Sequence, residues 1–113
     1  MQNGPYNDTE GIEVMSDKRG LQMSPQDDVV TLLAEVHAGD EVVIIGKKTG
    51  AAVGTVHALD AVPIYHKLAL RDIRAGESVH KYGEIIGVAT ADIKRGSHVH
   101  IHNIESAKTR NHD

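Results

Sequence analysis

The chain has 113 residues, which is enough for one domain with a modest core. It lacks Trp and Phe, so the core must be aliphatic, and it lacks Cys, so no disulfide or thiolate metal site can form. The formal net charge of −4 arises within residues 1–30, where six acids accompany two bases, and the balanced remainder argues against a nucleic-acid-binding surface. No apolar run approaches the roughly 20 residues that span a bilayer, and the N-terminus lacks a signal-peptide pattern, so we expect a cytoplasmic protein without membrane contact.

In chain order, residues 1–28 come first and are expected to form a flexible extension, because Gly, Pro and polar residues interrupt every apolar run. Residues 29–104 form the predicted folded unit, and residues 105–113 a polar tail. Residues 29–36 fit either a strand or a helix that Asp28 would cap. Short strands are predicted at residues 42–45, 53–59, 67–70, 84–89 and 98–104.

One turn pattern occurs three times in the folded unit. It consists of an acid, an apolar residue, two variable positions, a glycine, two more variable positions and a valine, and its glycines are Gly39, Gly76 and Gly96. Glycine adopts positive φ without steric cost, so each copy predicts a corner that leads into a strand. Several short strands joined by such corners indicate a mainly β domain.

Histidines carry the strongest chemical signal, since the chain holds eight of them and three alternate as His98, His100 and His102. In a strand these three side chains would share one face at a spacing of about 6.6 Å, and two could lean together onto one metal ion. A neutral imidazole can also transfer protons near pH 7. The alternative is a solvated strand face with Val99 and Ile101 in the core, and spacing alone does not decide between the two.

Two further groups are candidates for substrate contact. His66 and Lys67 place an imidazole beside an ammonium after Pro63, although a histidine in a turn can also be a plain surface residue. Lys81 and Tyr82 precede a glycine and could bind a carboxylate, or could simply form a hairpin turn. The other histidines are isolated and are expected to be structural: His37, His57, His80 and His112.

These motifs follow one another in a recognisable order. The series consists of Tyr65-His66-Lys67-Leu68-Ala69-Leu70-Arg71-Asp72-Ile73, Gly76-Glu77, Lys81-Tyr82-Gly83, Ile86-Gly87, Ala91-Asp92-Ile93, Gly96 and His98-Val99-His100-Ile101-His102-Asn103. This string resembles the SAF domain at the start of altronate and galactarate dehydratases. It also resembles the stand-alone small subunits of two-subunit altronate dehydratases and of sulfolactate sulfo-lyase. The resemblance covers residues 29–104, with one departure: Tyr65 stands where the family usually has glycine.

The resemblance implies a β-clip fold, mainly β, with short strands and one or two helical turns, one of them after a strand that begins at residue 29. It implies dehydration of a sugar acid to a 2-keto-3-deoxy acid, dependent on a divalent metal (Fe²⁺, with Mn²⁺ or Mg²⁺ possible) held largely by a separate large subunit. Alternatives are sulfite elimination and a non-catalytic sugar-acid-binding or adaptor module.

Within this scheme the candidate site residues fall into three groups. We expect His66 and His100 to act in catalysis. Lys67, Lys81, Tyr82 and Asn103 are expected to bind a small anionic hydroxy acid. The expected metal ligands are His98, His100 and His102.

Overall fold

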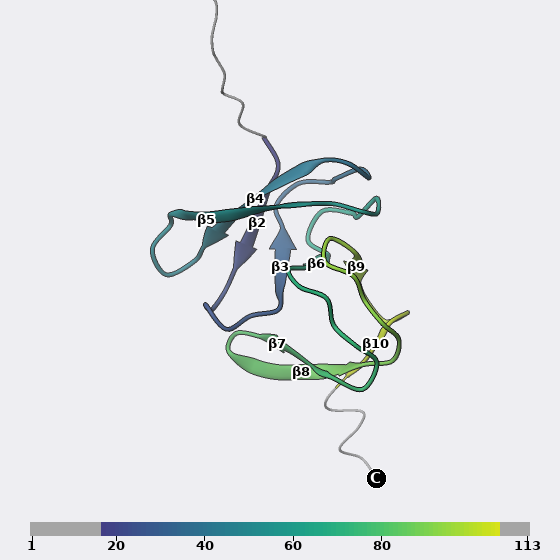
Figure 1. Cartoon of the computed structure of the whole chain (residues 1–113). Helices are drawn as coiled ribbons and strands as arrows, with labels where there is room; N and C mark the ends of the chain where they lie inside the picture. The colour runs from purple at the N-terminus through teal and green to yellow at the C-terminus, as the bar shows by residue number, and fades with distance from the viewer. Residues whose placement is uncertain (1–16, 107–113) are drawn as a thin grey trace, which may run out of the picture.

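The computed structural model describes residues 17–106, which form a mainly β fold of short strands (Figure 1). In chain order the strands are β2 (Arg19–Gln22), β3 (Val29–Leu32), β4 (Glu41–Gly46), β5 (Ala52–His57), β6 (Lys67–Ala69), β7 (Ser78–Lys81), β8 (Glu84–Ala89), β9 (His98–Val99) and β10 (Ile104–Ser106). The predicted mainly β class is confirmed. The helical turns are not found in residues 17–106, and this range contains no helix that could cross a membrane.

The strands form two sheets, a six-stranded sheet in the order β5-β4-β2-β3-β6-β9 and a three-stranded sheet in the order β10-β8-β7. β7 lies against β3, so the smaller sheet lies under one end of the larger one (Figure 1). Residues 29–36 begin as strand β3 and then bend, and Asp28 caps no helix. Successive β3 residues belong to different core clusters. Val30 packs with residues of the larger sheet, and Val29 belongs to the cluster that includes residues of the smaller sheet.

The predicted boundary at residue 28 is wrong for the part of the chain that the structure describes. β2 lies inside the larger sheet, parallel to β4 and antiparallel to β3. Gly20 allows this close packing, because a Cβ atom there would come within 2.7 Å of a Val30 methyl group. The C-terminal boundary also moves, since β10 continues to Ser106. The rest of both predicted tails lies outside the described residues.

The three predicted glycine corners are confirmed, with φ of 94° at Gly39 and 91° at both Gly76 and Gly96. A fourth corner, absent from the sequence analysis, has Tyr65 at the glycine position with φ of 71°. At all four corners this residue donates its backbone N–H to a carbonyl in or beside a strand: Gly39 to Ala58, Tyr65 to Leu32, Gly76 to Ala89, and Gly96 to Ala69. Tyr65 therefore adopts a backbone conformation that glycine prefers.

Two consecutive acids fasten the β7–β8 hairpin to the chain that leads into β3. The buried carboxylate of Asp27 accepts backbone N–H groups from Ser24 at 3.0 Å, Tyr82 at 2.9 Å and Gly83 at 2.8 Å. This cradle holds the turn between β7 and β8, in which Tyr82 has φ of 62°. Because Lys81 precedes that turn, Asp27 also determines where Lys81 lies.

The second acid, Asp28, accepts hydrogen bonds from Arg71 Nε at 2.7 Å and from the backbone N–H of His80 at 2.8 Å, and its Oδ2 lies 2.9 Å from His80 Nδ1. Burial raises the pKa of the Asp28 carboxyl, but the hydrogen bonds from Arg71 and His80 outweigh it and hold that pKa below 3.8. The Asp28 carboxylate is thus ionised, and its hydrogen bonds link the two sheets.

Candidate functional site

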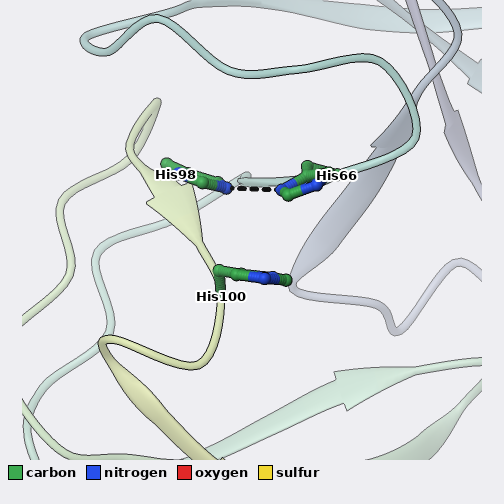
Figure 2. A group of neighbouring side chains, drawn as sticks. All are labelled: His66, His98 and His100. Atoms are coloured by element: carbon green, nitrogen blue, oxygen red, sulfur yellow. Dashed lines mark hydrogen bonds between the residues drawn. The ribbon is translucent and has the colours of Figure 1, made fainter.

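Three of the predicted site residues, His66, His98 and His100, come together although 32 residues separate the first from the second. One ring nitrogen from each lies within 4.8 Å of the other two. Figure 2 shows His98 on β9 and His100 just after it, with the ring of His66 facing that of His98, and the His66 Nδ1 to His98 Nε2 distance is 2.9 Å. All three side chains are partly buried.

The pairing of β6 with β9 brings the three rings together. Leu68 is opposite His98 and Lys67 is opposite Val99, so continuing this antiparallel register by one residue places His66 opposite His100. The ring centroids of His66 and His100 are accordingly 4.5 Å apart. Residues that face each other across an antiparallel pair approach closely, and here one of the two, His66, directly follows Tyr65 of the fourth corner.

The predicted strand over residues 98–104 is wrong, and this changes which of the predicted metal ligands lie together. β9 ends at Val99, the chain turns through residues 100–103, and Ile101 is 84% exposed instead of being in the core. His102 lies beside His98, with ring centroids 5.2 Å apart, but is not part of the three-nitrogen group. His66 takes its place.

Asn103 holds the turn that carries these rings. Its side chain is buried, accepts the backbone N–H of His100 at 2.9 Å and donates to the carbonyl of His98 at 2.8 Å. The backbone N–H of His98 in turn donates to Asp60 at 2.9 Å. Asn103 therefore positions the backbone of His98 and His100, and its predicted contact with substrate stays a prediction.

The electrostatics favour neutral imidazoles at His98 and His100. Burial, followed by the neighbouring His66, His102 and His100 rings, lowers the pKa of His98. Burial also lowers the pKa of His100, with His66 and Lys67 contributing. A neutral imidazole keeps a lone pair, which both metal coordination and proton abstraction require.

The nitrogens of His66 and His98 have the spacing of two ligands of one divalent metal ion. Two imidazole nitrogens at about 2.0–2.1 Å from one ion, with bond angles near 90–110°, are about 2.9–3.4 Å apart. The 2.9 Å hydrogen bond between His66 and His98 falls in that range. A His100 nitrogen lies within 4.8 Å of both, a wider limit, so His100 would have to move closer to share one ion with them. Imidazole donors suit iron, zinc and similar ions, and three of them leave coordination positions open for substrate.

Of the cationic candidates, Lys67 directly follows His66 in the chain. Lys67 is half-buried at the start of β6, and burial and the charge of Lys81 lower its pKa. The Lys81 ammonium lies 4.9 Å from the centre of the Tyr82 ring. The positions of Lys67 and Lys81 are therefore compatible with a joint role in binding an anion.

The other described histidines are not members of the three-nitrogen group. His37 is exposed in the first glycine corner and His57 ends β5. His80, however, is not isolated, because its ring contacts Asp28. The sequence analysis missed the roles of Asp27 and Asp28, for which the only signal was two adjacent acids before an apolar strand; His112 lies outside the described residues.

Comparisons with known proteins show similarity to dehydratases and to subunits of a lyase. A (2R)-sulfolactate sulfo-lyase subunit alpha from Chromohalobacter salexigens is 47% identical over 49 residues, which are 43% of this chain and 52% of that protein. Altronate dehydratase from Escherichia coli is 43% identical over 83 residues (74% of this chain, 15% of that protein), and altronate dehydratase from Bacillus subtilis is 30% identical over 89 residues (79% and 16%).

The matched segment therefore spans about half of the sulfo-lyase subunit and a small part of each dehydratase. The family model of the altronate/galactarate dehydratase SAF domain matches residues 18–107, a range that includes β2, the four corners and all three clustered histidines. The chain belongs to the altronate/galactarate dehydratase SAF domain family.

Proposed function

We propose that this chain is the small subunit of a cytoplasmic, metal-dependent lyase that removes water from a sugar acid such as altronate, giving a 2-keto-3-deoxy acid. The observation that carries the proposal is the convergence of His66, His98 and His100 beside the half-buried Lys67. Dehydratases and subunits of a lyase among its relatives support the same class of reaction.

The elimination requires a base that removes the proton from the carbon next to the substrate carboxylate, groups that stabilise the resulting enolate charge, and an acid that protonates the leaving group. A divalent metal, Fe²⁺ first and Mn²⁺ or Mg²⁺ next, would be held by His66, His98 and His100 together with groups of a large subunit, and would stabilise developing negative charge. The ammonium groups of Lys67 and Lys81 would bind the substrate carboxylate. A nitrogen bound to metal cannot accept a proton, so His66 and His100 act in proton transfer only when they are not ligands.

A second candidate reaction is the elimination of sulfite from sulfolactate. The two subunit alpha proteins of (2R)-sulfolactate sulfo-lyase are 47% and 45% identical to this chain over their matched segments, the latter across 70% of its own length. The two reactions share the proton abstraction and differ in the leaving group, so the same histidines and lysines serve either one.

The deciding experiment uses the complex of the full chain with its large subunit. We would isolate the complex through the tagged chain and assay altronate, galactarate and (2R)-sulfolactate with Fe²⁺, Mn²⁺ or Mg²⁺. The free chain should be inactive and the complex active. His66→Ala and His100→Ala should each lower turnover by roughly 10²–10⁴-fold if the ring transfers a proton. His37→Ala and His57→Ala are the matched controls and should retain wild-type rates.

Metal binding can be measured separately on the free chain. An ion present at 100 times its dissociation constant should raise the free energy of unfolding by about 2.7 kcal/mol, and this increase should vanish in His98→Ala. If every histidine variant keeps full activity in the complex, the chain is an adaptor and the proposed catalytic role is wrong.

A further inference from the structure

The four corners of the fold form two similar pairs. In each pair, two buried apolar residues face each other across an isolated antiparallel bridge, Val36 with Val62 in one pair and Ile73 with Ile93 in the other. Each bridging residue donates its backbone N–H to the carbonyl of the other, at 3.0 Å in the first pair and 2.7 Å in the second. The two pairs therefore share a backbone framework and can be compared position by position.

The exposed side chains of the third and fourth corners differ in kind. Around its buried bridging residue the third corner has three charged side chains, whereas the fourth corner has three uncharged ones at the same positions. All six are exposed, so one backbone arrangement presents a charged surface in one pair and an apolar surface in the other. The equivalent residues are Asp92 and Ala61, Lys94 and Pro63, Arg95 and Ile64, and Gly96 and Tyr65.

The apolar side chains of the fourth corner adjoin a further exposed one. Ile64 is 42% exposed, and Leu33, which is 44% exposed, lies beside the corner because the carbonyl of the preceding Leu32 accepts the backbone N–H of Tyr65. Ile64 also lines a hollow of about 260 Å³ between the first and fourth corners. Among the described residues that line this hollow, Glu35 is the one with a charge. A continuous exposed apolar surface of this kind is typical of a contact with another protein.

Tyr65 is the residue of this surface that the fold disfavours. The three other corners have glycine at its position, and its own φ of 71° is a left-handed conformation that costs free energy for a residue with a Cβ atom. The side chain is largely exposed, so packing within the described chain recovers little of that cost. Exposed aromatic residues are frequent anchors of protein interfaces, and a strained backbone often marks a functional position.

The position of this surface indicates which partner covers it. Tyr65 and His66 are consecutive, so their Cα atoms are about 3.8 Å apart. The first and fourth corners also lie away from the smaller sheet (Figure 1), which leaves the surface open to another chain. The proposed function has a large subunit that adds groups to the histidine site, and a chain that reaches this site must also cover the surface next to it.

We propose that the surface formed by Leu33, Ala61, Pro63, Ile64 and Tyr65, the fourth-corner patch, is where the large subunit docks through an apolar surface of its own. The inference rests on the proposed function for the identity of the partner. This chain matches 15% of altronate dehydratase from Escherichia coli, and the large subunit is expected to resemble the unmatched part of that protein. Docking at the patch brings the partner to the histidine group from the side of the fourth corner.

The test measures the affinity of the full chain for the purified large subunit by isothermal titration calorimetry. The large subunit is identified by its sequence, as a homologue of the unmatched part of altronate dehydratase. Ile64→Arg places a charge in the patch and should weaken binding by about 30-fold or more, as expected at the centre of an interface. The matched control is Ile85→Arg, the same change at a 52% exposed isoleucine of β8, which should bind within about 3-fold of wild type.

Tyr65→Gly separates docking from folding. The change removes the strained residue, so the melting temperature of the free chain should rise while the affinity for the large subunit falls by about 10-fold or more. A loss of affinity in a more stable chain does not come from unfolding, and this variant decides the matter if Ile64→Arg fails to fold. Wild-type affinity in Tyr65→Gly or in a folded Ile64→Arg overturns the docking surface, as does an equal loss in Ile85→Arg.

Two further measurements separate this inference from the proposed function. Sedimentation velocity should find the free chain monomeric, and a dimer that Ile64→Arg dissociates would overturn the inference by showing that a second copy covers the patch. If the complex forms through the patch but eliminates neither water nor sulfite, the proposed function fails and the docking surface stands. If the complex is active and Ile64→Arg binds normally, the docking surface alone fails. If the two wild-type chains do not bind each other, both fail.

Discussion

Replacing Asp27 by Asn tests whether the chain before β3 belongs to the folded unit. The Asp27 carboxylate accepts three backbone N–H groups, two on Oδ2 and one on Oδ1. Asparagine has one acceptor oxygen, so at least one of these donors must face an amide NH₂ group. A hydrogen bond to a charged group contributes about 1.5–3 kcal/mol and a neutral one about 0.5–1.5 kcal/mol.

Loss of one such bond, and of the charge that strengthens the other two, should lower the free energy of unfolding by about 2–4 kcal/mol. For a domain of this size each kcal/mol shifts the melting temperature by about 4–8 °C, so a decrease of at least about 8 °C is expected. Urea and thermal unfolding followed by circular dichroism would measure both quantities. The matched control is Asp17→Asn, the same change at an exposed position, which should stay within about 0.5 kcal/mol of wild type.

If Asp27→Asn unfolds like Asp17→Asn, the cradle contributes no stability and the reasoning is wrong. The expected loss also has a functional side, since the cradle positions Lys81 through Tyr82 and Gly83. Activity of the complex with the large subunit should therefore decrease in Asp27→Asn even at a temperature where the variant is fully folded.

Three more outcomes follow from the structure. Hydrogen bonds from Arg71 and His80 outweigh burial and hold the pKa of Asp28 below 3.8, so the stability that Asp28 contributes is present above that pH and is lost as pH falls through the lowered pKa. In acid unfolding titrations, the free energy of unfolding should therefore fall less steeply with pH in Asp28→Asn than in wild type. Tyr65→Gly should raise the free energy of unfolding by about 0.5–1 kcal/mol in urea titrations, because the left-handed conformation costs a tyrosine about 1–2 kcal/mol, whereas glycine costs about 0.5–1 kcal/mol in chain entropy. The tyrosine side chain is 69% exposed, so little packing is lost, and a destabilised variant would show that the ring does pack. Ile101→Ser should change stability by less than about 0.5 kcal/mol, whereas Val99→Ala should cost at least about 1.5 kcal/mol; equal costs in thermal melts would contradict the turn after β9.

The amino-acid sequence determined those features that depend on local chemistry. Glycine is the residue that readily adopts positive φ, so Gly39, Gly76 and Gly96 could be placed at corners before any pairing was known. The strands β4 and β8 could be predicted because each is an apolar run bounded by turn residues. An ordered series of short motifs was sufficient to indicate the family.

Only the tertiary structure decided which residues form the histidine group. Strand pairing is a contact between distant parts of the chain, so no local pattern places His66 opposite His100, and the turn that separates His102 depends on Asn103 being buried. For the same reason β2 was not predicted. Its four residues contain one large apolar side chain, and only their pairing with β3 and β4 shows that they belong to the folded unit. Tyr65 shows the limit most clearly, because its positive φ is imposed by hydrogen bonds to the neighbouring strand against the preference of the residue itself.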